Sequence, residues 1–105
     1  YLADLSQQTI FDNYFHIIDK SDLIFLDAPK DGEFEYLFIR NLMNSKLTQK
    51  PRILVMDDIK FLNMIKLWRS IKSPKIDATS FSHFSGTGIV DIQNSILIDQ
   101  RAFKF

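Results

Sequence analysis

Acidic side chains directly follow two apolar runs of the chain. Asp27 comes after the run at residues 23–26. Asp57 and Asp58 come after the run at residues 53–56. If these runs are neighbouring parallel strands, about 4.8 Å apart, the three carboxylates meet at one edge of the sheet. Like charges this close repel unless a cation lies among them, and oxygen ligands suit Mg²⁺ or Ca²⁺ better than Zn²⁺. The spacing therefore predicts a divalent-cation site.

Two further side chains are candidates for this edge, and His83 could contact substrate or assist proton transfer there. Lys30 lies three residues after Asp27 and is the other available cation. His83 stands in a segment of strand character, and a parallel strand would bring it to the same edge. The alternative for His83 is a hydrogen-bonded histidine at a sheet edge or in the core. The alternative for the acidic groups is that they are turn residues and helix caps, which are common after strands.

The elements that must position these residues alternate between helix and strand. Apolar residues recur at helical spacing over residues 5–18, 33–47 and 61–72. The continuous apolar runs at residues 23–26 and 53–56 are typical of strands buried on both faces. This alternation predicts an α/β fold with a parallel core, in which the crossover between the two strands is right-handed.

The last third of the chain has a different pattern. Residues 78–84 and 89–92 have strand character, and residues 95–98 could add a further strand. Between them, residues 85–88 read SGTG. We interpret this segment as a turn and not as a phosphate-binding loop, because it does not open a clear helix. An antiparallel hairpin is therefore expected at one edge of the sheet.

Composition and charge narrow the class of protein. The chain has 105 residues, 46% of them hydrophobic and 25% charged, which fits one small domain with a core and excludes disorder. Basic and acidic residues number 13 each, so the net charge of zero gives no indication of nucleic-acid binding or of a basic membrane surface. The absence of Cys excludes disulfides, thiolate metal sites and a cysteine nucleophile. With no apolar run long enough for a bilayer and no signal peptide, we expect a cytoplasmic protein.

The segments that carry the acidic groups resemble a known enzyme family. Residues 22–32 read DLIFLDAPKDG, and residues 52–59 read RILVMDDI. Together they resemble the C-terminal half of a class I S-adenosylmethionine-dependent methyltransferase, which has a Rossmann-like sheet. They are similar in particular to the metal-dependent O-methyltransferases of the catechol and caffeoyl-CoA type. The resemblance implies that residues 23–26 and 53–56 are the neighbouring fourth and fifth strands. Residues 79–89 would then lead through the sixth strand into an antiparallel seventh.

The resemblance also implies roles for individual residues. Asp27, Lys30 and Asp57 match the family's acidic and basic positions directly, and Asp58 replaces an Asn that the family usually has there. The three Asp residues would hold a divalent cation, which would bind the acceptor hydroxyl and lower its pKa. Lys30 would be the general base. Asp4 resembles an acidic position near the adenine of S-adenosylmethionine, so it and Asp27 are the expected cofactor contacts.

The chain departs from the family in its glycines. The family carries a glycine-rich loop after its first strand, which lets the backbone approach the cofactor. Gly32, Gly86 and Gly88 are the three glycines here, and none has that spacing after an early strand. We therefore expect residues 1–105 to form a single partial domain that would not bind the cofactor tightly alone. The expected acceptor is a small molecule.

Other classes of protein fit part of the pattern. A bacterial receiver domain also has an acidic pair and a phosphoacceptor Asp, but in the reverse order, so this chain would have to be circularly permuted. A non-catalytic α/β module could use the apolar residues 96–105 to pair with a partner chain, and an exposed edge strand would favour a homodimer. In methyltransferases of this class that need no metal, the same carboxylates would form turns or contact substrate.

Overall fold

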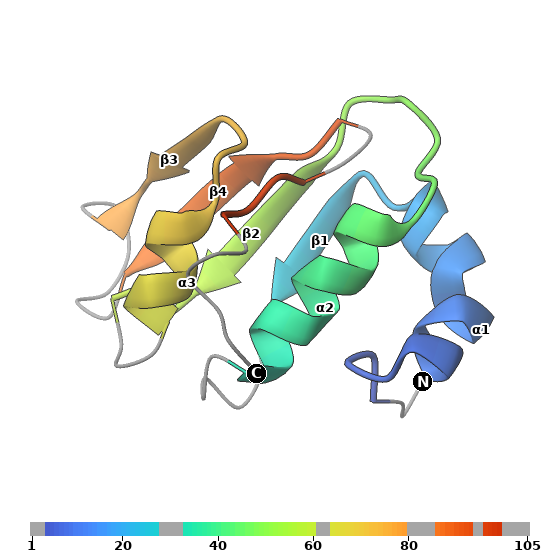
Figure 1. Ribbon diagram of the computed structural model, residues 1–105. Coiled ribbons are helices and arrows are strands. Elements are labelled where there is room, and N and C mark those ends of the chain that lie inside the picture. The colour runs from blue at the N-terminus through green and yellow to red at the C-terminus, as the bar shows by residue number, and fades with distance from the viewer. Residues whose placement is uncertain (1–3, 28–32, 61–63, 80–85, 94–95, 100–105) are drawn as a thin grey trace.

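The computed structural model describes residues 4–27, 33–60, 64–79, 86–93 and 96–99. Helices and strands alternate along most of this length (Figure 1). The three predicted helices and the two predicted central strands are present, with shifted ends. The elements in chain order are α1 (Gln8–Lys20), β1 (Leu23–Leu26), α2 (Glu33–Asn44), β2 (Ile53–Asp57), α3 (Met64–Ser70), β3 (Lys75–Asp77) and β4 (Thr87–Asp91).

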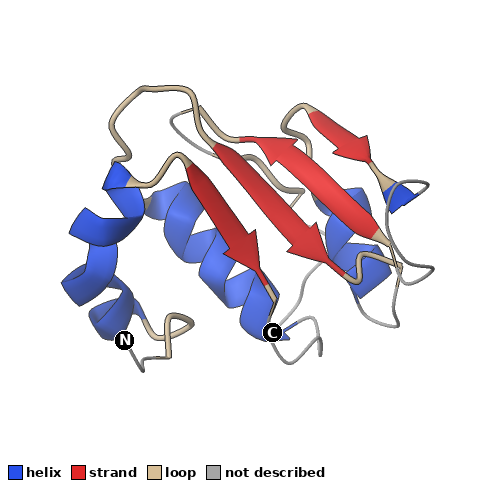
Figure 2. Ribbon diagram, turned by 180° about the vertical axis from the view of Figure 1, so that it is seen from behind, coloured by secondary structure: helices blue, strands red, loops and turns tan. Residues whose placement is uncertain are grey.

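The four strands form one mixed sheet in the order β1-β2-β4-β3. β1 and β2 are parallel neighbours, and β4 runs antiparallel to both β2 and β3 (Figure 2). β1, β2 and β3 therefore point in the same direction, and their carboxyl ends share one edge of the sheet. The predicted α/β class, the parallel pair and the antiparallel pairing at one edge are confirmed.

The strand predicted at residues 78–84 is contradicted at its first two residues, the two that the structure describes. The described strand here is β3, and Ala78 and Thr79 lie beyond its end. Residues 80–84 lie outside the described residues. The Asp77 carboxylate accepts hydrogen bonds from both the backbone amide and the hydroxyl of Thr79. This local bonding turns the chain away from the extended conformation and ends the strand.

Two other predictions for the last third of the chain are confirmed only in part. Within residues 85–88, Gly86 has a φ of 95°, which is typical of a turn, but the two residues after it already belong to β4. The strand suggested at residues 95–98 is reduced, among its described residues, to a single bridge between Ile98 and Ile71. Within the described residues, the antiparallel edge of the sheet is thus shorter than the sequence indicates.

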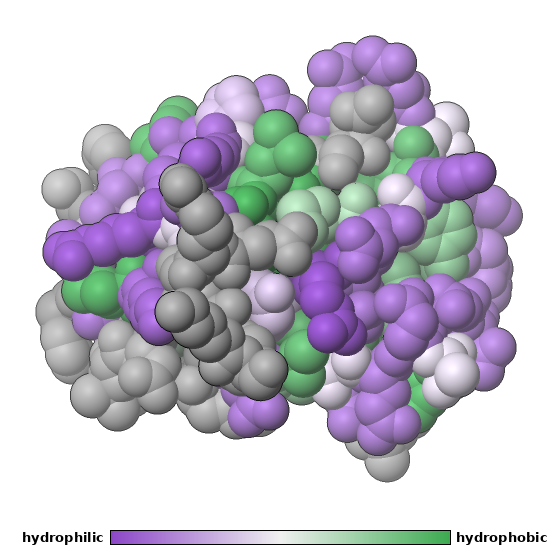
Figure 3. All heavy atoms as spheres, in the orientation of Figure 1, coloured by the Kyte–Doolittle hydropathy of each residue, from purple (hydrophilic) through white to green (hydrophobic). Residues whose placement is uncertain are grey.

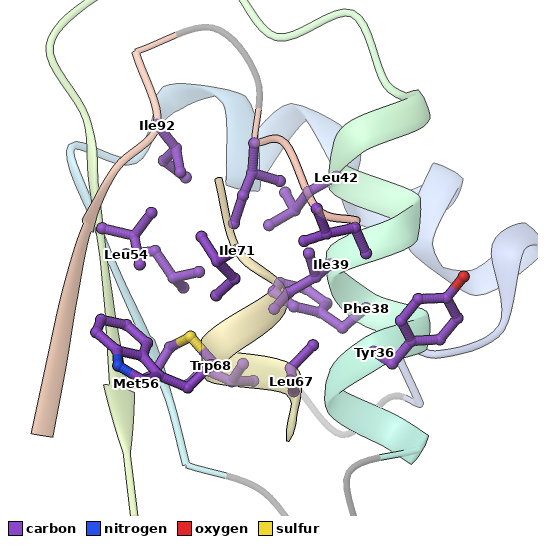
Figure 4. Packing of buried hydrophobic residues seen from close by; sticks show 14 of the residues in the cluster. Tyr36, Phe38, Ile39, Leu42, Leu54, Met56, Leu67, Trp68, Ile71 and Ile92 are labelled. Carbon is purple, nitrogen blue, oxygen red and sulfur yellow. The ribbon is translucent and has the colours of Figure 1, made fainter. Parts of the chain in front are cut away.

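One face of the sheet is covered by α2 and α3, and the hydrophobic core lies between them and the strands (Figure 4). Leu54 and Met56 of β2 are fully buried there, as are Ile39 of α2 and Leu67 of α3. Hydrophilic side chains form much of the outer surface over α1 and α2 (Figure 3). This side of the molecule therefore has the usual order of a hydrophobic interior below a hydrophilic surface.

The other face of the sheet carries no helix among the described residues (Figure 2). Leu23 and Phe25 of β1 are 55% and 59% exposed, and Ile53 of β2 is 38% exposed. The prediction that these two strands are buried on both faces is therefore wrong. The apolar runs were interpreted correctly as parallel strands, but α2 and α3 lie on the same side of the sheet.

A buried arginine joins the ends of several elements. The Arg52 side chain has no exposed surface and donates hydrogen bonds to the carbonyls of Ser21, Thr48 and Gln93 at 3.0–3.2 Å. It also donates to the carbonyl of Asp19 at 2.7 Å and lies 3.3 Å from the Asp19 carboxylate. One guanidinium therefore connects the C-terminal end of α1, the loop before β2 and the segment after β4.

Candidate metal-binding site

The register of the parallel strands places the acidic residues together. Leu23 pairs with Ile53 and Leu26 pairs with Met56, so β1 and β2 end level with one another. Asp27 and Asp57 are the next residues on the two strands, and Asp58 follows Asp57. One carboxylate oxygen from each of the three lies within 4.8 Å of the others. The sequence prediction that these side chains lie close together agrees with this geometry.

The backbone at Asp58 helps to shape this cluster. Asp58 has a φ of 57°, and its amide donates a hydrogen bond of 2.8 Å to the carbonyl of Gly86. Short polar side chains such as Asp and Asn tolerate this left-handed conformation better than other residues with a Cβ. Gly86 also has a positive φ, and an added Cβ would lie 2.9 Å from Ile59. The turn after β2 and the segment before β4 therefore each contain one residue with positive φ, and the hydrogen bond between these two residues holds Asp58 in place.

The spacing of the carboxylates fits a hard divalent cation. Two oxygens on opposite sides of a bound Ca²⁺ are about 4.6–5.2 Å apart, and about 4.0–4.2 Å apart for Mg²⁺. The largest separation in the cluster, 4.8 Å, lies within the first range and slightly above the second. Asp27 is exposed and Asp57 and Asp58 are half-buried, so an ion can reach the site from solvent and retain water ligands. The donor set is all oxygen, which favours these two metals over Zn²⁺.

The remaining site residues of the sequence prediction lie apart from this cluster or outside the described residues. Lys30 and His83 belong to the segments that the structure does not describe. Asp4 lies in the segment before α1, where its carboxylate accepts hydrogen bonds from the amide and hydroxyl of Ser6. These two hydrogen bonds lower the pKa of Asp4. Among the described contacts Asp4 thus shapes a local turn, and its contact with a cofactor stays a prediction.

One acidic residue at the same edge of the sheet is not among the predicted site residues. Asp77 is the last residue of β3, which runs in the same direction as β1 and β2. Its pKa is lowered, mainly because Thr79 donates two hydrogen bonds to its carboxylate, and Lys60 lies 3.7 Å away. β3 reads Lys-Ile-Asp, and its single apolar residue gives no strand signal in the sequence that could have identified Asp77. It is absent from the cluster and serves as a turn residue with an ion pair.

A hollow of about 290 Å³ adjoins the cluster at Asp27. It follows the open edge of β1 and is bounded on the other side by α1 and α2. Its lining is mostly apolar and includes Ile18, Phe34 and Phe38. A small apolar group could therefore lie next to the acidic cluster.

No protein-family model, curated protein or solved structure matches the chain. Within the described residues, none of the helices has the length and apolar character needed to cross a membrane. The sheet topology and the acidic cluster are therefore the observations on which a function can be proposed.

Proposed function

We propose that this chain is the C-terminal half of a class I S-adenosylmethionine-dependent methyltransferase that transfers a methyl group to a hydroxyl oxygen of a small molecule. The observation that carries the proposal is the meeting of Asp27, Asp57 and Asp58 at the carboxyl ends of two neighbouring parallel strands. In open α/β sheets, ligands bind at this edge. The sequence resemblance assigns a metal-holding role to the same three residues.

The order of the strands supports the proposal as well. The resemblance implies that the two acidic strands are neighbours and that the last strand is antiparallel. β1 and β2 are parallel neighbours, and β4, the last described strand, is antiparallel to β2. This topology agrees with a half of a Rossmann-like methyltransferase sheet. It is also compatible with other small α/β domains, so the acidic cluster remains the more specific support.

The chemistry assigned to this chain is positioning and proton transfer. S-adenosylmethionine would supply the methyl group, and a divalent cation would act as a Lewis acid on the acceptor hydroxyl. Asp27, Asp57 and Asp58 would hold the cation, and their oxygens would fix where the acceptor lies. Lys30 would accept the hydroxyl proton as general base, and His83 would contact the acceptor or assist this transfer. Asp4 would contact the cofactor.

The proposal predicts divalent-cation binding that depends on the cluster. Titration of the 105-residue chain with Ca²⁺ and Mg²⁺, followed by isothermal calorimetry, should detect one site. Asp57→Asn should weaken it by about tenfold or more, because one charged ligand is lost. Asp91→Asn is the matched control, since Asp91 is an exposed acid at the far end of the adjacent strand β4. Equal effects of the two substitutions, or no binding at all, would contradict the metal site.

Methyl transfer needs a separate measurement in the full natural polypeptide. Incorporation of radiolabelled methyl from S-adenosylmethionine into catechol, with and without Mg²⁺, tests the class of reaction directly. Catechol is a suitable probe because its hydroxyl oxygens are small-molecule acceptors of the implied type. Transfer that Asp57→Asn abolishes and Asp91→Asn leaves intact would support the proposal. Metal binding without any methyl transfer would favour a non-catalytic module instead.

A further inference from the structure

A lysine lies beside the acidic cluster, and the residue before it fixes its position. Lys60 follows Asp58 by two residues, and Ile59 between them is fully buried. Two peptide units span at most about 7 Å, so the Cα atoms of Asp58 and Lys60 are no farther apart than this. The buried Ile59 therefore holds a carboxylate and an ammonium group close together at the carboxyl edge of the sheet.

The side chain of Lys60 runs along this edge toward β3. Its Nζ lies 3.7 Å from the Asp77 carboxylate. Its stem lies against Gly86, because a Cβ added to this glycine would be 3.0 Å from Cγ of Lys60. The carbonyl of Gly86 accepts the hydrogen bond from the amide of Asp58. The Lys60 side chain therefore joins the turn that carries Asp58 to the end of β3.

The carboxylate of Asp77 has a fixed position and a fixed charge. The backbone amide and the hydroxyl of Thr79 both donate hydrogen bonds to it. These hydrogen bonds are the main cause of the lowered pKa of Asp77, and Lys60 lowers it further. Asp77 is therefore ionised at neutral pH and presents a stationary negative charge to Lys60.

The ion pair between Lys60 and Asp77 can open without disturbing the fold. The two side chains are 47% and 41% exposed, and exposed ion pairs of this kind contribute little to stability. Lysine carries its charge on a flexible four-carbon stem, so the ammonium group can move while the backbone stays in place. When the pair opens, the nearest other carboxylate along the chain is that of Asp58.

We propose that Lys60 is an internal competitor for the divalent-cation site and that Asp77 holds it away from that site. While Lys60 is paired with Asp77, the three carboxylates of the cluster are left to the ion. When the pair opens, the ammonium group neutralises part of the cluster and weakens binding of the ion, because affinity follows the charge of the ligand set. Lys60 thus sets the affinity for the cation without being a ligand. This inference rests on the metal site of the proposed function.

Calorimetric titration of the 105-residue chain with Ca²⁺ at low ionic strength tests the proposal. Lys60→Gln should tighten binding by about threefold or more, because it removes a positive charge near the ion. Lys60→Arg keeps that charge and should restore the natural affinity. Lys72→Gln is the matched control, since Lys72 is an exposed lysine that precedes the first residue of β3 and so lies toward the opposite edge of the sheet.

Substitution of Asp77 gives the opposite result if it acts through Lys60. Asp77→Asn releases the ammonium group and should weaken Ca²⁺ binding by about threefold or more. In the Lys60→Gln background the same substitution should have little further effect, so the two changes are non-additive. A purely structural role of the ion pair would not give this pattern.

Two sets of results would overturn the proposal, and they differ in what they leave standing. Ca²⁺ binding that Lys60→Gln leaves unchanged, or strictly additive effects of Lys60→Gln and Asp77→Asn, would exclude the competition and leave the metal site in place. A natural chain that binds no Ca²⁺ would exclude the metal site itself. Lys60→Gln leaves the hydrogen bonds of Thr79 to Asp77 intact, so its result holds even where Asp77→Asn disturbs the end of β3.

Discussion

At the scale of single residues, the acidic cluster depends on backbone conformation as much as on charge. Asp27 and Asp57 come together because two parallel strands end level with each other. Asp58 joins them from a residue with positive φ, where its amide bonds to Gly86. The Asn that the resembling family has at this position also tolerates positive φ. Asp58 therefore adopts a conformation that Asn would also tolerate, and it carries one more negative charge than Asn would.

Substitutions at Asp58 should separate its backbone role from its charge. Asp58→Ala and Asp58→Gly both remove the carboxylate, but only Ala is strained at a φ of 57°. We expect Asp58→Ala to have a free energy of unfolding about 1 kcal/mol lower than Asp58→Gly, which reflects the cost of a left-handed residue with a Cβ. Urea unfolding measures this difference. Equal stability of the two variants would show that the loop relaxes without cost.

Asp58→Asn completes the comparison, because it keeps the favourable conformation and removes one charge. Its stability should be close to that of the natural chain, while its affinity for Ca²⁺ should be lower. A large loss of stability in this variant would mean that the charge of Asp58 matters to the fold through its other contacts.

At the scale of elements, the sequence predicts those helices and strands whose positions are determined by local patterns of apolar residues. The helices, the parallel pair and the meeting of Asp27 with Asp57 all follow from periodicity and from the rule that parallel strands end at one edge. The end of β3 cannot be predicted from periodicity, because it depends on the hydrogen bonds that Thr79 donates to Asp77. Exposure of Phe25 could not be predicted either, since it depends on which side of the sheet each helix occupies.

Packing between α3 and β4 requires a glycine at one position. Gly88 of β4 lies under the ring of Trp68, and a Cβ added there would be 2.4 Å from the ring. We expect Gly88→Ala to destabilise the chain by about 1–3 kcal/mol, the usual cost of overpacking a core. Thermal unfolding measures the loss. The backbone of Gly88 also pairs with Met56, so the ring cannot be accommodated by moving the strand alone.

A double variant tests this explanation. Replacing Trp68 by Leu in the Gly88→Ala background removes the atoms that the new Cβ would meet. The combined loss of stability should then be smaller than the sum of the two single losses. Simple additivity would mean that the ring moves away without resistance and that Gly88 is required for another reason.

At the scale of the whole molecule, the end of the sheet opposite the acidic cluster is held by hydrogen bonds from two basic side chains, the buried Arg52 and the more exposed Lys50. Arg52 donates to four backbone carbonyls, and Lys50 donates to the carbonyl of Lys20 and to the carboxylate of Asp22. A buried guanidinium is tolerated only when its donors are satisfied in this way. The molecule thus has one end fixed by basic residues on carbonyls and the other end lined with carboxylates.

The carboxylate of Asp19 lies at this end of the sheet, and its ionisation should make the free energy of unfolding depend on pH. The carboxylate accepts hydrogen bonds from the amide and hydroxyl of Thr48 at 2.6 and 2.7 Å. These bonds are the main cause of its lowered pKa, and Arg52 and Lys50 lower it further. A carboxylate whose pKa is lower in the folded chain stabilises the fold above its ordinary pKa of 3.8, and this contribution is lost as the pH falls through the folded value.

Denaturant unfolding of the natural chain and of Asp19→Asn at several pH values tests this dependence. The natural chain should be the more stable at neutral pH, and the difference should shrink as the pH falls below about 4. Thr48→Val keeps the backbone donor but removes the hydroxyl, so it should reduce the acid-dependent part of the stability without abolishing it. A difference between the natural chain and Asp19→Asn that stays constant with pH would contradict the role of the Asp19 charge. Its side chain would then act by shape alone, and the buried Arg52 would be satisfied by carbonyls without help from a carboxylate.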